Sequence, residues 1–158
     1  MFAAETEDRS VPAGPPWRVL LVDDEPDVHA VTRMALGRFQ FDGRGLEFLH
    51  AYSAAEAREI LTRESDIALV FLDVVMESES AGLEVVRWLR QELGNQFIRI
   101  VLRTGQPGQA PEESVIVDYD INDYKEKTEL DRKKLFTTVF VALRAYRDIM
   151  LVEEARTY

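Results

Sequence analysis

The 158-residue chain contains no cysteine, and this absence excludes several kinds of site at once. Without thiols there is no disulfide, no thiolate zinc site and no cysteine nucleophile. An excess of positive charge is also absent, because 19 lysines and arginines stand against 29 aspartates and glutamates, for a net charge of −10. Nucleic-acid-binding domains usually carry a basic face. We therefore expect no direct nucleic-acid contact.

Long hydrophobic runs are absent as well. No run approaches the roughly 18 apolar residues that a membrane-spanning helix needs, so we expect no membrane insertion. Residues 1–16 are rich in acids and prolines and lack the basic start and apolar stretch of a signal peptide. We interpret them as a flexible N-terminal extension. Together with the missing cysteines, this pattern favours a cytoplasmic location.

What the chain does contain is a strand–helix alternation that repeats five times. Short apolar runs predict buried strands at 17–24, 46–52, 66–75, 97–104 and 121–126. Helical patterns follow them, and after the first strand Val28, Val31, Ala35 and Phe39 recur at helical spacing and are expected to face the core. Ser53 with Glu56 forms a capping box for the second helix. The alternation predicts an α/β fold with a doubly wound, five-stranded parallel sheet.

Polar residues collect where the predicted strands end. They are Asp23, Asp24 and Glu25 after the first strand, Asp73 after the third, Thr104 after the fourth and Lys127 after the fifth. The carboxyl ends of parallel strands share one edge of the sheet, where binding sites form. Clustered carboxylates repel one another, and their oxygen ligands suit Mg²⁺. Asp73 is then placed to attack a phosphoryl group, with Mg²⁺ and Lys127 neutralising its charge.

Four segments together carry a family resemblance: LLVDDEP at 20–26, LVFLDVVM at 69–76, VLRTG at 101–105 and DYKEKT at 123–128. In this order they resemble the receiver domains of bacterial two-component response regulators, over about residues 17–145. The resemblance implies a flavodoxin-like fold and a phosphoryl group that Asp73 accepts from a histidine kinase or a histidine phosphotransfer protein. It also implies Mg²⁺ bound by Asp23, Asp24, Asp73 and the backbone carbonyl of Val75, with Thr104 as switch hydroxyl, Tyr124 as switch aromatic and Lys127 as the site lysine.

Several positions depart from the pattern of that family. Glu77 replaces a customary proline, and Thr128 replaces another, which leaves open whether the peptide before Thr128 is cis. Arg103 stands where an apolar residue is common. It either turns toward the pocket and pairs with phosphate or, as we expect, turns away as an exposed charge. Of the two histidines, His29 is expected at the surface and His50 without a metal-binding partner.

The loop after the fourth strand and the last helix are both unusual. The glycines and prolines of LRTGQPGQAPEE (102–113) predict a long, partly stiffened switch loop and a short helix from about Pro111 to Val117. From Thr128 onward no glycine or proline interrupts a helical pattern that reaches about Ala155. We interpret 146–158 as a helical extension that leads to an output domain or forms a dimer.

Three functions are compatible with these features to different degrees. The first is a phosphoswitch, and the second is a phosphate-independent binding or dimerisation module with the receiver fold. The third, an aspartyl phosphohydrolase, needs a second acid two residues after Asp73, where Val75 stands, so we expect no enzyme with an external substrate. More specifically, LRTGQPGQAPE and DYDINDYKEKTEL resemble receivers that are joined to a domain of unknown function. In that group the output is often an HD-GYP cyclic-di-GMP phosphodiesterase or a histidine kinase.

Overall fold

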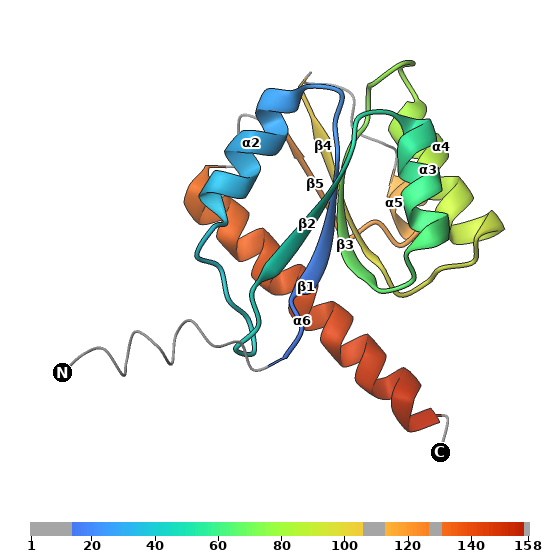
Figure 1. Cartoon of the computed structure of the whole chain (residues 1–158). Helices are drawn as coiled ribbons and strands as arrows, with labels where there is room; N and C mark the ends of the chain where they lie inside the picture. The colour runs from blue at the N-terminus through green and yellow to red at the C-terminus, as the bar shows by residue number, and fades with distance from the viewer. Residues whose placement is uncertain (1–13, 106–112, 127–130, 157–158) are drawn as a thin grey trace.

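Five strands form one parallel sheet, as predicted, and their order is β2-β1-β3-β4-β5 (Figure 1). The computed structural model describes residues 14–105, 113–126 and 131–156. The strands are β1 (Trp17–Val22), β2 (Leu46–Ala51), β3 (Ile67–Asp73), β4 (Arg99–Thr104) and β5 (Asp123–Glu126). The order reverses between β1 and β3, so the carboxyl ends of these two strands border the crevice in which such sheets place their sites.

Helices cover both faces of the sheet (Figure 1). One face carries α2 (Pro26–Ala35) and α6 (Arg132–Arg156); the other carries α3 (Ala54–Arg63), α4 (Ala81–Arg87) with its π-helical continuation η1 (Trp88–Glu92), and α5 (Glu113–Asp118). Two apolar layers fill the space between helices and sheet. Strand β3 is buried at all 7 of its positions because both layers pack against it. The doubly wound α/β architecture is thus confirmed.

Local sequence signals start and stop the helices where expected. The Ser53 hydroxyl accepts a hydrogen bond from the Glu56 backbone N–H at 3.1 Å, and the Glu56 carboxylate accepts one from the Tyr52 N–H at 3.0 Å. The predicted capping box is therefore present at the start of α3. Gly94 adopts a φ of 75°, which suits a glycine just beyond a helix end. The π-helical turn before it was not predicted.

The buried face of α2 is polar, which corrects two predictions. His29 is 2 % exposed and Thr32 is fully buried, whereas Val31 is 64 % exposed. The inward position expected for Val31 is therefore wrong, as is the surface position expected for His29, whereas Ala35 and Phe39 pack on the core as expected. Both polar side chains have hydrogen-bond partners at the carboxyl edge of the sheet, and these contacts set the rotation of the helix about its axis.

The short helix and the long last helix are both present, although α6 begins at Arg132, after the non-helical Asp131, and not at Thr128 as predicted. Helix α5 has 6 residues, none of them buried, while most of the predicted switch loop (106–112) lies outside the described residues. Helix α6 is unbroken over 25 residues, about 37 Å at 1.5 Å per residue, and its second half runs past the sheet (Figure 1). The domain limits at 17 and 145 stay predictions. Within the described ranges, no helix is both long and apolar enough to cross a membrane.

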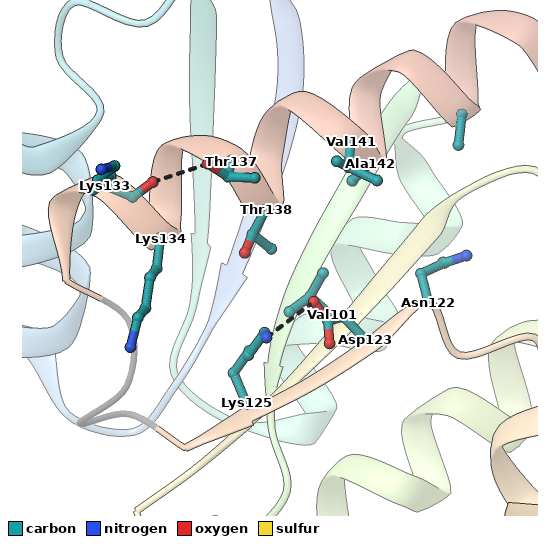
Figure 2. A pocket seen from close by; sticks show the side chains of 11 residues that line it. Val101, Asn122, Asp123, Lys125, Lys133, Lys134, Thr137, Thr138, Val141 and Ala142 are labelled. Carbon is teal, nitrogen blue, oxygen red and sulfur yellow. Dashed lines mark hydrogen bonds and ion pairs between the residues drawn. The ribbon is translucent and has the colours of Figure 1, made fainter.

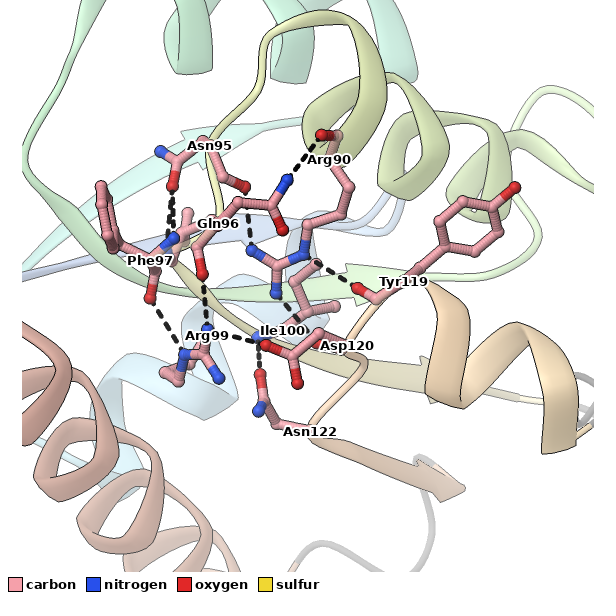
Figure 3. A network of polar contacts seen from close by, with 10 residues as sticks. Arg90, Asn95, Gln96, Phe97, Arg99, Ile100, Tyr119, Asp120 and Asn122 are labelled. Carbon is pink, nitrogen blue, oxygen red and sulfur yellow. Dashed lines mark hydrogen bonds and ion pairs between the residues drawn. The ribbon is translucent and has the colours of Figure 1, made fainter.

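Two buried arginines, Arg90 and Arg99, link the segments that precede β4 and β5, at the end of the sheet opposite the carboxyl edge (Figure 3). Arg90 donates to the carbonyls of Tyr119, Asn95 and Asp120 at 2.8, 3.0 and 2.9 Å. Arg99 donates to two backbone carbonyls and pairs with the Asp120 carboxylate at 3.1 Å. Burial lowers the pKa of Arg90 to about 10, with Arg99 adding to the effect, so Arg90 is still a cation at neutral pH. It anchors η1 to the segment between α5 and β5.

Replacing Arg90 by methionine should destabilise the chain, because three partly buried hydrogen bonds to backbone carbonyls are lost. We expect Arg90→Met to lower the free energy of unfolding by about 2–3 kcal/mol, measured by urea titration. Arg87→Met, at an exposed position of the same helical stretch, should change it by less than about 0.5 kcal/mol. Equal effects of the two substitutions would contradict a clamping role for Arg90.

Candidate functional site

Acidic side chains gather at the carboxyl ends of β1 and β3. Oxygen atoms of Asp23, Asp24 and Glu25 lie within 4.8 Å of one another. Asp23 is 3 % exposed, whereas Asp24 and Glu25 are exposed. Asp23 Oδ1 accepts a hydrogen bond from the Glu25 N–H at 2.9 Å, which curls the chain around the carboxylate. The predicted pair is brought together, and Glu25 joins it as a third carboxylate that was not predicted to be a ligand.

Asp73 ends β3, beside β1, and is 3 % exposed. Its Oδ1 accepts a hydrogen bond from the N–H of Val75 at 3.3 Å, so the residue whose carbonyl is a predicted ligand already contacts Asp73. Within the described part of the chain, the compact acidic group does not include Asp73. The edge thus holds a tight cluster at β1 and one buried carboxylate on the adjoining strand.

The backbone behind Asp73 is closely packed against α4. The Gly82 N–H donates to the Val74 carbonyl at 3.0 Å. A Cβ atom at Gly82 would lie 2.2 Å from the Asp73 carbonyl oxygen, so only glycine fits there. Glu77, which replaces a family proline, accepts from the Ala54 N–H at 3.1 and 3.2 Å. This carboxylate lies at the positive end of α3 and ties the loop after β3 to that helix.

Thr104 and Tyr124 lie on the α3–α5 side of the sheet. Thr104 is fully buried at the end of β4. Tyr124 pairs in register with Leu102, two residues before Thr104, and packs against the same apolar layer as Leu102. The Tyr124 hydroxyl is buried too. The two predicted switch residues therefore share one face of neighbouring strands.

The predicted site lysine, Lys127, lies outside the described residues, as does Thr128, so the role of the first and the peptide before the second stay predictions. Lys125 lies on the other face of β5 and lines a hollow of about 580 Å³ between β5 and α6 (Figure 2). There it pairs with Asp123 at 3.8 Å. This position agrees with the expectation that Lys125 faces away from the site.

Arg103 is buried, and the prediction of an exposed charge is wrong. Its side chain is 7 % exposed, and two of its nitrogens donate to Thr32 Oγ1 at 3.1 Å each. The guanidinium carbon lies 5.0 Å from the centre of the Phe71 ring. Burial lowers the pKa of Arg103, while the charges of Asp23 and Asp73 act in the opposite direction. A hydroxyl, a ring and two carboxylates thus replace water around this cation.

The two histidines form a hydrogen-bonded pair beside Asp23. His29 Nε2 lies 2.8 Å from the Asp23 carbonyl oxygen, and His29 Nδ1 lies 2.7 Å from His50 Nδ1. A carbonyl accepts only, so His29 Nε2 carries a proton; in the neutral ring its Nδ1 then accepts from His50 Nδ1–H. His50 Nε2 is left to accept from Arg33 at 3.4 Å. The hydrogen bonds all point toward Asp23, an arrangement without a local sequence signal.

The sequence profile of the response regulator receiver domain matches residues 19–140. The chain belongs to the response regulator receiver domain family. Over 154 residues it is 52 % identical to a 3'3'-cGAMP-specific phosphodiesterase 2 of Vibrio cholerae, an alignment that covers 98 % of this chain and 30 % of that protein. The chain therefore spans less than a third of this relative and is a receiver module.

Solved receiver domains share the fold. A receiver domain from Clostridium thermocellum superimposes with a TM-score of 0.68 at 22 % identity, covering 85 % of this chain and 98 % of that one. The receiver of an HD domain-containing protein from Pseudomonas fluorescens gives a TM-score of 0.68 at 18 % identity, covering 89 % and 96 % of the two chains. These likenesses confirm the predicted flavodoxin-like receiver fold.

The close approach at Gly82 gives a stability prediction. Gly82→Ala should lower the free energy of unfolding by about 2–3 kcal/mol, because the new methyl group collides with the Asp73 carbonyl. Gly45→Ala is the matched control, since a Cβ there meets nothing within 4 Å, and it should change stability by less than about 0.5 kcal/mol. Urea unfolding followed by tryptophan fluorescence measures both. Equal stabilities for the two variants would contradict the close packing behind Asp73.

The histidine pair gives a pH prediction. Burial lowers the pKa of His50 below its usual value, and electrostatic interaction with the neighbouring His29 and Arg33 adds to this. His50 is then less basic in the folded chain than in the unfolded chain, so its contribution to stability is complete above about pH 6.5. That contribution is lost as the pH falls through the folded pKa. His50→Asn keeps a donor for His29 without titrating, so its urea midpoint should fall less than that of the wild type between about pH 7.5 and 5.5. Parallel pH profiles would contradict this assignment.

Proposed function

We propose that the chain is a phosphorylation-activated receiver that accepts a phosphoryl group on Asp73 from a histidine kinase or a histidine phosphotransfer protein. One observation carries the proposal: Asp73 is buried at the end of β3, between the acidic group at the end of β1 and the buried Thr104 at the end of β4. A nucleophile, a cation site and a hydroxyl donor thus occupy neighbouring strand ends.

The chemistry follows from this placement. A carboxylate oxygen of Asp73 forms a bond to phosphorus while the P–N bond of the donor phosphohistidine breaks and its imidazole leaves. The Thr104 hydroxyl then donates a hydrogen bond to a phosphoryl oxygen. Lys127 is proposed for the same charge-neutralising role from the family resemblance alone. The domain turns over no other substrate.

The donor set of the edge fits Mg²⁺. Carboxylate oxygens of Asp23 and Asp24, with Asp73 and the Val75 carbonyl, are hard ligands, and the exposure of Asp24 leaves water positions open. When bound, Mg²⁺ neutralises the charge on the transferring phosphoryl group. Glu25 lies close enough to the first two acids to support the ion through water.

We propose that the signal leaves through the face formed by α5, β5 and α6. A phosphoryl group on Asp73 draws the Thr104 hydroxyl toward it, and Tyr124, on the same side of the sheet, follows into the vacated space. No residue of α5 is buried, so this helix has little packing to lose when its surroundings shift. The conformations with and without this inward shift of Thr104 and Tyr124 are in equilibrium, and phosphorylation of Asp73 increases the population of the shifted one.

The output proposed for this receiver is a cyclic-dinucleotide phosphodiesterase C-terminal to the chain. The support is the 52 % identity over 98 % of this chain to a protein named for 3'3'-cGAMP hydrolysis, which favours a phosphodiesterase output over the histidine kinase output. Helix α6 presents Leu151 and Val152, 56 % and 62 % exposed, beyond the sheet. Those residues suit either a helical connection to the output or a homodimer contact.

Phosphorylation by acetyl phosphate tests the central claim. With Mg²⁺ present, the wild-type chain should gain one phosphoryl group, detected by mass spectrometry, and Asp73→Asn should abolish the gain because the amide is not a nucleophile. EDTA should abolish it as well. Asp66→Asn, at an exposed carboxylate before β3, is the matched control and should be labelled like the wild type.

Labelling that survives Asp73→Asn unchanged would place the phosphoryl group elsewhere. A wild-type chain that gains none, under conditions that label a known receiver, would instead favour the alternative function, a phosphate-independent module for binding or dimerisation. That alternative rests on the departures at Glu77 and Thr128.

A further inference from the structure

Three buried charges lie on one face of the sheet at its carboxyl edge. Asp73 and Arg103 are register partners on β3 and β4, so their side chains fall on the same face as Phe71 and Val101, the side covered by α2 and α6. Asp23, after β1, continues that face. Asp23 and Asp73 are 3 % exposed and Arg103 is 7 % exposed. Two negative charges and one positive charge are therefore shielded from water together.

The direct partners of Arg103 do not account for its burial. Among the described residues its only hydrogen-bond acceptor is Thr32 Oγ1, a neutral oxygen that two of its nitrogens share at 3.1 Å. Its Nε is buried and has no hydrogen-bond partner in the described part of the chain. A planar guanidinium with five N–H donors usually meets a carboxylate in a bidentate pair, and no such pair forms with a described residue here. Its position needs another physical reason.

Longer-range electrostatics supply that reason. A buried cation costs several kcal/mol unless charges nearby offset the lost hydration. Asp23 and Asp73 both favour the charged form of Arg103, and the Phe71 ring at 5.0 Å adds a cation–π contact. Charge–charge interaction is mutual, so Arg103 in turn offsets the repulsion between the two carboxylates.

We propose that Arg103 is a built-in counterion of the Asp23–Asp73 pair, which stabilises the acidic site without metal and thereby weakens its affinity for Mg²⁺. In the metal-free chain the guanidinium replaces part of the positive charge that two buried carboxylates require. An arriving Mg²⁺ meets a site whose negative potential is already reduced, and it is also repelled by a fixed cation in a poorly screened interior. Arg103 is thus a positioning residue that tunes the ion's affinity. The Mg²⁺ part rests on the proposed function.

Mg²⁺ titration of charge variants tests this role. Isothermal calorimetry on the 158-residue chain should show that Arg103→Met binds Mg²⁺ about tenfold more tightly than the wild type, because a repulsive charge has gone. Arg103→Lys keeps the charge and should stay within about threefold. Lys125→Met is the matched control: Lys125 is the register partner of Arg103 on β5, one strand further from Asp73, and its loss should change the affinity less than about threefold.

A metal-free measurement separates this proposal from the proposed function. In EDTA, Arg103→Met should raise the unfolding equilibrium constant about tenfold more in the wild-type background than in Asp73→Asn, where one of the two negative charges is absent. The variant should still fold, because Thr32 Oγ1 keeps its own hydrogen bond to the Val28 carbonyl at 2.7 Å. Arg103→Gln, a neutral side chain able to bond Thr32, should give the same coupling.

The Mg²⁺ titration and the unfolding measurement in EDTA together decide whether Arg103 is a counterion. Tighter Mg²⁺ binding by Arg103→Met together with coupling to Asp73 supports the counterion role. Unchanged or weaker Mg²⁺ binding, or no coupling in EDTA, overturns it. If the wild-type chain binds no Mg²⁺, the metal site of the proposed function fails, and the coupling in EDTA alone then decides the role of Arg103.

Discussion

Like-charge repulsion at a buried edge is the constraint on which the rest of this structure depends. A parallel sheet brings the carboxyl ends of its strands to one edge, and here two of those ends carry Asp23 and Asp73, each 3 % exposed. Buried carboxylates are tolerated only where donors or positive charge surround them. The elements around the edge are arranged accordingly: α2 turns His29 and Thr32 inward, and β4 places Arg103 on the same face of the sheet as the acids.

The backbone at these acids is fixed as firmly as their side chains. His29 holds the Asp23 carbonyl, and the missing side chain of Gly82 lets α4 approach the Asp73 carbonyl. Helix α5, on the same face of the sheet as α4, differs, since it buries none of its residues and its C-terminal end is held by Arg90 through the Tyr119 carbonyl. A change at Asp73 therefore meets closely packed neighbours in α2 and α4 and a more loosely packed one in α5. This difference supports the proposed response through Thr104, Tyr124 and α5.

The strands, the alternation of strands and helices along the chain, and the polar residues at the strand ends were predictable because each is marked by a local sequence pattern. A continuous apolar run such as IALVFLD (67–73) needs no partner to be recognised as a buried strand, and Ser53 with Glu56 marks a helix start by itself. The errors concern side chains whose partners are distant in the chain. Arg103 meets Thr32 across 71 positions, and His29 meets His50 across 21. The spacing of apolar residues placed Val28 and Val31 on the inward face of α2. That spacing carries no information on the polar partners that His29 and Thr32 find on other strands.

The contacts of Glu77 and Arg103 show that these departures from the family pattern add interactions to the acidic edge. An eroded site would be expected to hold charges that point to solvent or lack partners. Glu77 instead accepts hydrogen bonds at the start of α3, and Arg103 lies buried beside both acids. Both of these residues make contacts that a proline at position 77 or an apolar residue at position 103 would lack. Substitutions that add polar contacts to the acidic edge favour a site rebuilt around Asp73 over one that has lost its phosphoryl chemistry, and so favour the phosphoswitch over a phosphate-independent module.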